Sequence, residues 1–230
     1  MIISHEHKFI FLKTKKTAGT SIELALSELC GPDDIIAPLT KIDEALRASG
    51  RGAQNWRLHG WWQSPRPFWQ RRFFKFAAED YGFYNHMPAE QAKTLFNDDR
   101  AWRSYFKFAF DRNPWDRQVS AYHFRYRGKD RPPSFSCFLD RDRRARLNNY
   151  EIYSLDGEPC VDFLGRFETL EEDFRRALSE IGLKFEHALP RAKSGIRRNN
   201  KHYRDYYDDR TRDVVGGWYE REIRLLGYSS

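Results

Sequence analysis

The sequence predicts an α/β domain in which helices flank a central, mainly parallel β-sheet, and two observations lead to this prediction. Short apolar runs of strand length alternate along the chain with longer segments of helical spacing, a pattern typical of parallel sheets covered by helices. At 230 residues, the chain is long enough to bury roughly 70% of its unfolded surface. We therefore expect a single domain over residues 1–230.

The first strand–helix unit lies near the start of the chain. The four central residues of the segment 8–13 are all apolar, as in a strand buried on both faces. A polar loop at 14–19 follows. Apolar residues at helical spacing then predict a helix at 20–29, which ends before Gly31 and Pro32.

Two further units and a last helix are predicted in the second half of the chain. Pro114 suits the first turn of a helix, where its missing N–H costs nothing. Thr169 and Glu172 have the spacing of a capping box. The predicted strands are 105–110 and 161–167, and the predicted helices are 115–126, 170–181 and 211–226, with another that starts at Pro88.

A long segment at about 41–80 has no clear period and is rich in aromatic residues, among them Trp56, Trp61, Trp62 and Trp69. Such a segment in a compact domain is often a functional insertion or a lid. Its rings could stack on an acceptor sugar, or they could form a satellite hydrophobic cluster. The sequence leaves both interpretations open.

The composition excludes several classes of protein. Aromatic residues make up 16% of the chain, which argues against disorder. No run approaches ~18 apolar residues, so we expect no membrane span, and the first residues lack the features of a signal peptide. The cysteines, Cys30, Cys137 and Cys160, fit neither a disulfide framework nor zinc spacing, so we expect a reducing, cytoplasmic compartment.

The net charge of +7, from 40 Lys and Arg against 33 Asp and Glu, is unevenly distributed. Residues 8–21 and 191–204 are basic and contain no acid, whereas elsewhere the two signs are interspersed. Local basic clusters suit a compact polyanion, while an extended basic stripe would suit a nucleic acid better. A solvated basic surface is the plain alternative for either cluster.

The loop at 13–21, Lys13-Thr14-Lys15-Lys16-Thr17-Ala18-Gly19-Thr20-Ser21, has the chemistry of an anion cradle. Backbone N–H groups at a helix N-terminus carry partial positive charge, and Gly19 allows close approach of a ligand to the backbone. Lys16 adds a point charge, and the hydroxyls of Thr17, Thr20 and Ser21 add donors. A Walker A motif is absent, because the lysine precedes the glycine.

A second candidate anion site follows the predicted strand at 105–110. The strand delivers Arg112 at its carboxyl end, where ligands bind in open parallel sheets. Ser120 lies about two helical turns further on and could reach the same anion. Arg112 could equally form an ion pair with Asp116.

These segments resemble the sulfotransferases that use 3′-phosphoadenosine 5′-phosphosulfate (PAPS), and the carbohydrate-type family in particular. The resemblance rests on four blocks in the expected order over most of the chain. Lys15 departs from the family pattern, which usually has proline there, and we expect a less rigid loop. The blocks are 16–21, 112–122 (Arg-Asn-Pro-Trp-Asp-Arg-Gln-Val-Ser-Ala-Tyr), 162–174 and 203–228.

The resemblance implies a P-loop-kinase-like, three-layer fold and a PAPS-binding site. It implies that the Lys16 loop holds the 5′-phosphosulfate and that Arg112 and Ser120 hold the 3′-phosphate. Lys193 and Arg197, in the basic segment 191–204, would also cover the 3′-phosphate, although this segment could be a basic surface only. The donor-binding set that we expect is Lys13, Lys15, Lys16, Thr17, Ala18, Gly19, Thr20, Ser21, Arg112, Ser120, Lys193 and Arg197.

Sulfuryl transfer needs a base for the acceptor hydroxyl, and histidine fits best near neutral pH. In the family that this chain resembles, a histidine placed like His86 often serves, so we expect His86 as base and Lys16 at the leaving phosphate. Glu79 or Asp80 is the alternative base, and a capping or surface role is the plain alternative for His86. We expect no metal, and PAP (3′-phosphoadenosine 5′-phosphate) as product.

The expected function is therefore transfer of a sulfuryl group from PAPS to a hydroxyl or amine of a carbohydrate or small metabolite. A nucleic-acid-binding module, a nucleoside-phosphate kinase and a catalytically inactive PAP-binding relative are the alternatives. The kinase would need a Gly-Lys-Ser/Thr loop, which is missing. The sequence does not indicate the acceptor or the oligomeric state.

Overall fold

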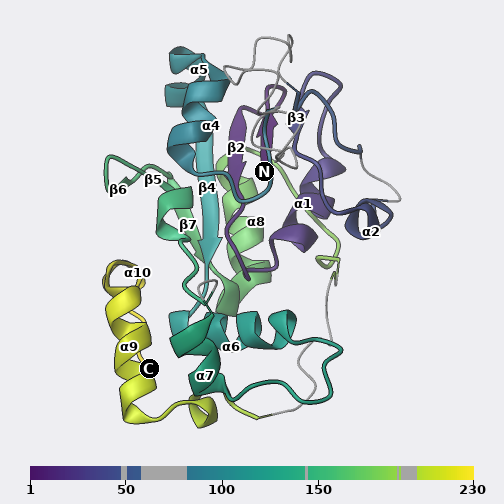
Figure 1. The fold of residues 1–230 in the computed structure, drawn as a ribbon. Helices are drawn as coiled ribbons and strands as arrows, with labels where there is room; N and C mark the ends of the chain where they lie inside the picture. Colours follow the sequence, from purple (N-terminus) through teal and green to yellow (C-terminus); the bar gives the residue numbers. More distant parts are fainter. Residues whose placement is uncertain (48–50, 58–81, 143–144, 191, 193–200) are drawn as a thin grey trace, which may run out of the picture.

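A five-stranded sheet forms the centre of the molecule in a computed structural model that describes residues 1–47, 51–57, 82–142, 145–190, 192 and 201–230 (Figure 1). The strand order is β3-β1-β2-β4-β7. The strands are β1 (Ile2–Ser4), β2 (Phe9–Leu12), β3 (Ile35–Ile36), β4 (Phe106–Asp111) and β7 (Phe163–Arg166).

The sheet is mixed rather than mainly parallel, which corrects the prediction. Strands β2, β4 and β7 are parallel, as expected, but β1 is antiparallel to both β2 and β3. The predicted first strand is thus the second arm of a hairpin, whose turn ends at Lys8 with φ 55°. The three residues of β1 are too few to show a period, so the sequence does not reveal the hairpin.

Both faces of the sheet are buried, and strand β2 shows how the two layers of helices are held. Phe9 and Phe11 pack on one side against α1 (Gly19–Ser27) and α8 (Leu170–Glu180). Ile10 and Leu12 pack on the other side, against α4 (Ala89–Phe96) and α5 (Asp99–Ser104). Each such buried side chain contributes about 1.5–3 kcal/mol, and the predicted layering of helix, sheet and helix is confirmed.

A second group of helices covers the end of the sheet toward which β4 points (Figure 1). It packs around its own apolar cluster, which includes Trp115, Tyr122 and Phe138. The group consists of α6 (Pro114–Arg125), α7 (Phe135–Arg141), α9 (Asp209–Trp218) and α10 (Glu220–Leu226). The shorter elements are α2 (Lys41–Glu44), η3 (Tyr150–Ile152), β5 (Ser154–Leu155), β6 (Glu158–Pro159), η4 (Phe167–Thr169) and η5 (Tyr203–Tyr206).

Two details of the predicted helices are wrong. Thr169 makes no cap for α8; its hydroxyl donates instead to Asp173 Oδ2 at 2.8 Å, and the same oxygen accepts from the Arg166 N–H. The predicted last helix is two helices, α9 and α10, which meet at Tyr219. The other predicted helices and strands agree with the structure to within a few residues.

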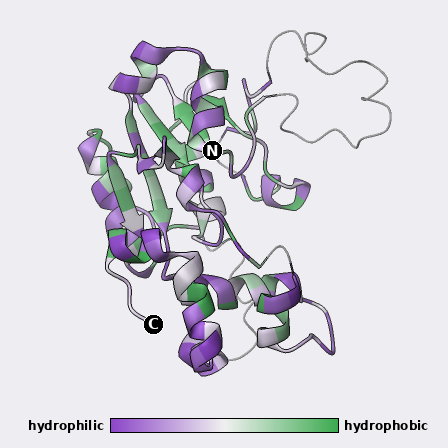
Figure 2. Ribbon diagram, turned by 60° about the vertical axis from the view of Figure 1, so that its left-hand side comes forward, coloured by the Kyte–Doolittle hydropathy of each residue, from purple (hydrophilic) through white to green (hydrophobic). Residues whose placement is uncertain are grey.

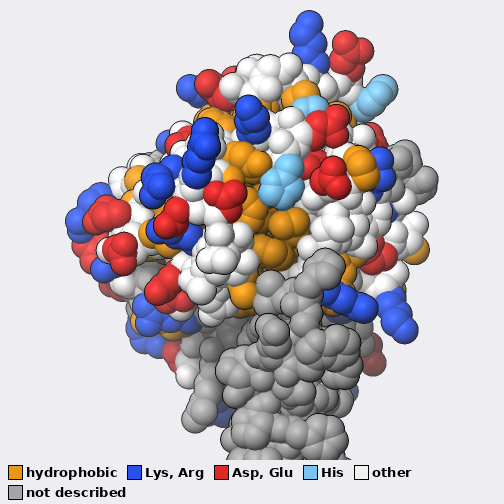
Figure 3. Space-filling view, turned by 90° about the horizontal axis from the view of Figure 1, so that it is seen from above, with side chains coloured by type: hydrophobic (Ala, Val, Ile, Leu, Met, Phe, Trp, Pro, Cys, Tyr) orange, Lys and Arg blue, Asp and Glu red, His pale blue; other side chains and the backbone are white. Residues whose placement is uncertain are grey.

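The distribution of polarity follows from the layers. Figure 2 shows apolar strands in green beneath helices that alternate between polar and apolar residues. Seen from the α5 end, basic and acidic side chains are interspersed around an apolar strip (Figure 3). The net charge of +7 is thus not concentrated on the described part of that face.

The described parts of the aromatic-rich segment, 41–47 and 51–57, include α2 and Trp56, which packs against the β1–β2 core. Trp61, Trp62 and Trp69 lie outside the described residues.

Cys30, Cys137 and Cys160 are free thiols. Within the described ranges, every helix is too short or too polar to cross a bilayer.

Gly165 in β7 provides a test of the core. A Cβ there would lie 2.4 Å from the Phe110 ring, so Gly165→Ala should lower the free energy of unfolding by about 1–3 kcal/mol through overpacking. Gly217→Ala on exposed α9 is the matched control, since its Cβ meets nothing within 4 Å; it should stabilise by about 0.5–1 kcal/mol. Urea denaturation of both variants measures this, and equal effects would contradict the packing described here.

Candidate anion-binding and transfer site

The loop between β2 and α1 has the backbone shape of an anion cradle. Lys16 and Ala18 adopt left-handed conformations, with φ 65° and 57°, and such residues occur in the backbone nests that bind anions. Ala18 is the N-cap of α1 and has no side-chain acceptor for the first-turn N–H groups, and no acid lies in that turn. The loop therefore presents partial positive charge outward.

Asn149 holds this loop from within the protein. Its Oδ1 accepts from the Lys15 N–H at 2.9 Å, and its Nδ2 donates to the Lys15 carbonyl at 3.0 Å. A proline at 15 would lack the first of these hydrogen bonds. The loop is thus anchored at the position where we expected it to be less rigid. Burial lowers the pKa of Lys15.

Two loop threonines are used internally. The Thr14 hydroxyl donates to the Phe110 carbonyl at the end of β4 and lies 2.8 Å from the Thr17 hydroxyl. Thr20 and Ser21 are also buried, and Ser21 Oγ accepts from the Ala192 N–H at 3.3 Å. These contacts tie the loop to β4 and to the segment before 193–200.

Arg112 connects the two predicted anion sites. Its Nη1 donates to the Lys16 carbonyl at 3.3 Å, while Nε and Nη2 donate to Asp116 Oδ2 at 2.8 and 2.5 Å. Its guanidinium also stacks 3.9 Å from the Phe167 ring centroid. The ion pair with Asp116 is thus confirmed, and Arg112 also lies against the loop, while its role as an anion ligand stays a prediction.

Ser120 lies on the same face of α6 as Asp116 and Phe124, since residues four apart share a helix face. Asp116 binds Arg112, and the Lys16 ammonium lies 4.0 Å from the Phe124 ring centroid. Ser120 therefore lies between Asp116, which contacts Arg112, and Phe124, which contacts Lys16. The structure brings these three predicted residues together at one end of the sheet.

His86 lies in a turn before α4, with a left-handed φ of 62°. Its Nδ1 is 3.1 Å from the Lys13 carbonyl oxygen. Because a carbonyl only accepts, Nδ1 carries the proton and Nε2 keeps its lone pair. Burial, followed by the charge of Lys13, lowers the pKa of His86 to about 3, so the imidazole is neutral at pH 7.

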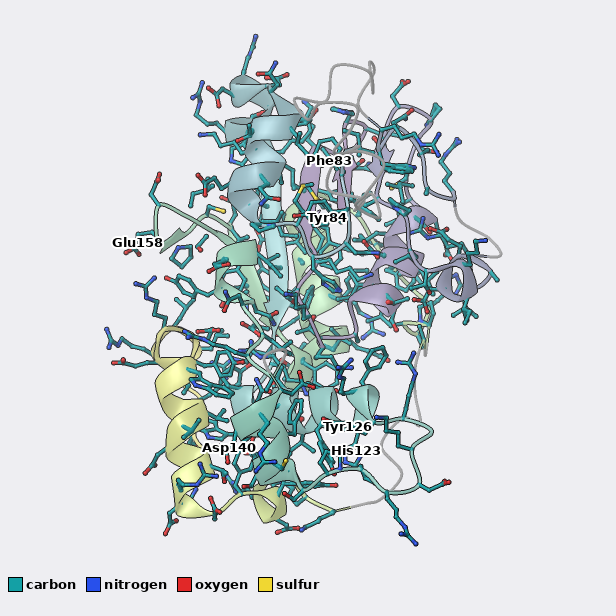
Figure 4. The ribbon with its side chains drawn as sticks, in the orientation of Figure 1. Phe83, Tyr84, His123, Tyr126, Asp140 and Glu158 are labelled. Atoms are coloured by element: carbon teal, nitrogen blue, oxygen red, sulfur yellow. The ribbon has the colours of Figure 1, made fainter. Side chains whose placement is uncertain are left out.

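The segment with His86 and helix α6 approach the loop from different ends of the molecule. Figure 4 shows Phe83 and Tyr84, which precede His86, beside the sheet, whereas His123 and Tyr126 of α6 lie at the lower end. The loop after β2 turns at the end of the sheet that faces α6 (Figure 1). His86 and Arg112 therefore contact the loop from separate elements.

Lys13 has less than a twentieth of its surface exposed, and its ammonium contacts Glu23 Oε2 at 2.5 Å and Asn85 Oδ1 at 3.0 Å. Gly19 packs against its stem, because a Cβ at 19 would lie 2.7 Å from Lys13 Cγ. The glycine thus serves close packing with Lys13, a reason that we did not predict. Lys193, Arg197, Glu79 and Asp80 lie outside the described residues.

A buried ionic cluster that we did not predict supports the site. Asp111 ends β4 and accepts from Arg117 Nη1 at 2.6 Å, and Arg117 Nη2 donates to Glu222 at 3.2 Å. Asn149 Nδ2 and the Tyr153 hydroxyl also donate to Asp111, at 3.0 and 2.9 Å. Asp111 directly precedes the block at 112–122 and Arg117 lies within it, but nothing local marks Asn149 or Tyr153.

The cluster shifts the pKa values of its members. Burial alone would lower the pKa of Arg117, but Asp111, Tyr219 and Glu222 raise it above its ordinary value. Burial raises the pKa of Glu222. Among the residues that the structure describes, no group of three or more His, Cys, Asp or Glu could hold a metal ion.

Comparison with known proteins shows which family the sequence matches. A sequence model described as the Sulfotransferase family matches residues 1–229. An uncharacterized protein from Archaeoglobus fulgidus is 34% identical over 83 residues, which cover 34% of this chain and 69% of that protein. No solved structure matches the chain.

The buried pair between Asp111 and Arg117 should dominate stability at this end of the sheet. Arg117→Met leaves Asp111 buried without its cation and should lower the free energy of unfolding by about 3–5 kcal/mol. Arg210→Met breaks an exposed pair with Asp140 and should cost at most about 1 kcal/mol. Urea denaturation distinguishes the two, and a small effect of Arg117→Met would refute the supporting role.

Proposed function

This chain belongs to the sulfotransferase family, and we propose that it transfers the sulfuryl group of PAPS to a hydroxyl or an amine of a carbohydrate or small metabolite. The observation that carries the proposal is the convergence of Lys16, Arg112 and Ser120, with His86 joined to the same loop through Lys13. These groups supply cationic donors and a neutral base, which sulfuryl transfer requires.

The donor site is proposed on the chemistry of its groups. The N–H groups from Ala18 to Ser21 and the Lys16 ammonium suit the 5′-phosphosulfate, because a helix N-terminus and a lysine both favour compact anions. Arg112 and Ser120 suit the 3′-phosphate, since a guanidinium forms paired hydrogen bonds with phosphate oxygens. Lys193 and Arg197 remain predicted ligands of the same phosphate.

In the proposed reaction, the acceptor oxygen attacks sulfur in line with the bond to the bridging phosphate oxygen. A new oxygen–sulfur bond forms as that bond breaks, and the acceptor proton moves to Nε2 of His86. Lys16 stabilises the negative charge that develops on the departing phosphate of PAP. The imidazole is unprotonated at pH 7, but a pKa of about 3 makes it a weak base in the free protein, because a general base is most efficient with a pKa near the working pH.

We further propose that the β2–loop–α1 unit is related to the phosphate-binding unit of P-loop nucleotide kinases. The support is the order of strand, anion loop and helix, followed by the parallel neighbour β4. The three free thiols support the expected reducing, cytoplasmic compartment. Acceptor contacts are proposed for the segment at about 41–80.

Thermal denaturation with PAP tests the donor site. A ligand at 100 times its Kd stabilises the folded protein by about 2.7 kcal/mol, which is a rise in Tm of roughly 5–10 °C for this length. Lys16→Ala and Arg112→Ala each remove one cation and should reduce the rise at equal PAP concentration. Arg175→Ala on α8, whose partner is Glu171, is the control and should retain the full rise.

No rise in Tm for the wild-type protein at saturating PAP would contradict the proposed donor. A nucleic-acid-binding module would instead bind oligonucleotides with a steep dependence on salt and without competition from PAP.

His86→Ala tests the base. Loss of a general base lowers turnover by about 10²–10⁴-fold, while the Tm rise with PAP should stay intact because His86 lies outside the donor set. Turnover is measured with labelled PAPS once an acceptor is found by screening. Near-normal turnover would show that another group is the general base, and Glu79 and Asp80 are the predicted alternatives.

A further inference from the structure

Lys13 occupies the junction between the donor loop and the segment that carries His86. It follows directly after β2, and it contacts two consecutive residues of that segment by different groups. Its ammonium contacts Asn85 Oδ1 at 3.0 Å, and its carbonyl accepts from His86 Nδ1 at 3.1 Å. Asn85 Nδ2 in turn donates to the Pro38 carbonyl at 2.6 Å.

This two-point attachment fixes the imidazole ring. The hydrogen bond from Nδ1 sets the tautomer and directs Nε2 away from Lys13, as a second partner does for other catalytic histidines. His86 also has φ 62°, a conformation that costs a non-glycine residue about 1–3 kcal/mol. Such a conformation persists only when surrounding contacts hold it, and the contacts with Lys13 do so.

The Lys13 side chain is itself held by α1. Glu23, which is fully buried, accepts from the Lys13 ammonium at 2.5 Å and from the Met1 amine. The stem of Lys13 packs against Gly19, where any Cβ would overlap it. The short contact with this buried carboxylate holds the Lys13 ammonium in place.

We infer that Lys13 is a positioning residue for the base, held by Glu23, and that it joins the donor loop to the Asn85–His86 turn. The inference rests on the proposed function of His86. It reassigns Lys13 from the predicted set of donor ligands, because the ammonium contacts Glu23 of α1 and Asn85 of the base segment. The Lys13 side chain would then fix the position of the base relative to the donor loop.

The charges around His86 make this coupling measurable without a substrate. Lys13, the Met1 amine and Lys15 are the cations that lower the pKa of His86, after burial, and the hydrogen bond to the Lys13 carbonyl opposes them. Among these cations, Lys13 has the largest effect on the pKa of His86. Removing it should raise the pKa of His86, whereas loss of a merely structural contact elsewhere should not.

The test is Lys13→Met, which keeps an unbranched stem and removes the ammonium. We expect kcat to fall by about 10–100-fold, since small displacements of a catalytic group have effects of this size, and Kd for PAP to stay within about twofold. The imidazole signals of His86, assigned by comparison with His86→Gln, should titrate at a higher pH in NMR spectra.

Two further variants complete the test. Asn85→Ala removes the amide contacts with Lys13 and Pro38 and leaves the pair between Lys13 and Glu23, so kcat should fall less and Kd for PAP should not change. It also carries the test if Lys13→Met does not fold. Lys107→Met is the control, because Lys107 is a buried β4 lysine paired with Asp162 at 3.1 Å, and it should lose stability without a change in kcat.

Two results would overturn the inference. A loss of PAP affinity in Lys13→Met that matches the loss of kcat/KM would make Lys13 a donor ligand. Unchanged kcat together with an unchanged pKa of His86 would remove any positioning role. Absence of PAP binding in the wild-type protein would instead count against the proposed function, and the NMR titration would still test the coupling of Lys13 to His86.

Discussion

The buried ion pair between Asp111 and Arg117 is the interaction on which the arrangement of the site depends. Asp111 ends β4 with no exposed surface, and it accepts hydrogen bonds from Arg117 of α6, from the Tyr153 hydroxyl just after η3 and from the Asn149 amide. Removing a carboxylate from water is costly, and four donors, including the Arg112 N–H, offset that cost. Asn149 then links this cluster to the loop between β2 and α1, through its two hydrogen bonds with the Lys15 backbone.

The topology of the sheet brings the two predicted anion-binding segments together. β2 and β4 are adjacent and parallel, with Leu12 opposite Ala109, so the residues that follow them emerge side by side. This is the end of a parallel pair at which α/β proteins bind ligands. Lys16 and Arg112 are 96 residues apart in the chain, yet Arg112 donates to the Lys16 carbonyl.

The sequence predicts this part of the structure well because each unit carries a local signal. Apolar runs, helical spacing and Pro114 mark β2, α1, β4 and α6, and parallel pairing then follows from their alternation. The β1–β2 hairpin escapes prediction, since three residues carry no period. Asn149 escapes for another reason: its two hydrogen bonds reach Lys15 across 134 residues, and no local pattern records such a pairing.

The contacts of His86, the proposed base, are also too distant in sequence to be predicted, and they determine its protonation state. His86 is visible in the sequence as a histidine before a helix, but the lysine and glutamate that set its environment are 73 and 63 positions away. Their arrangement keeps the imidazole neutral in the free protein, because burial and the Lys13 charge disfavour its protonated form. Under the proposed function, an anionic donor bound beside Lys16 would oppose that field and raise the proton affinity of Nε2. The proposed base would then be unprotonated before the donor binds and a better proton acceptor once it has bound.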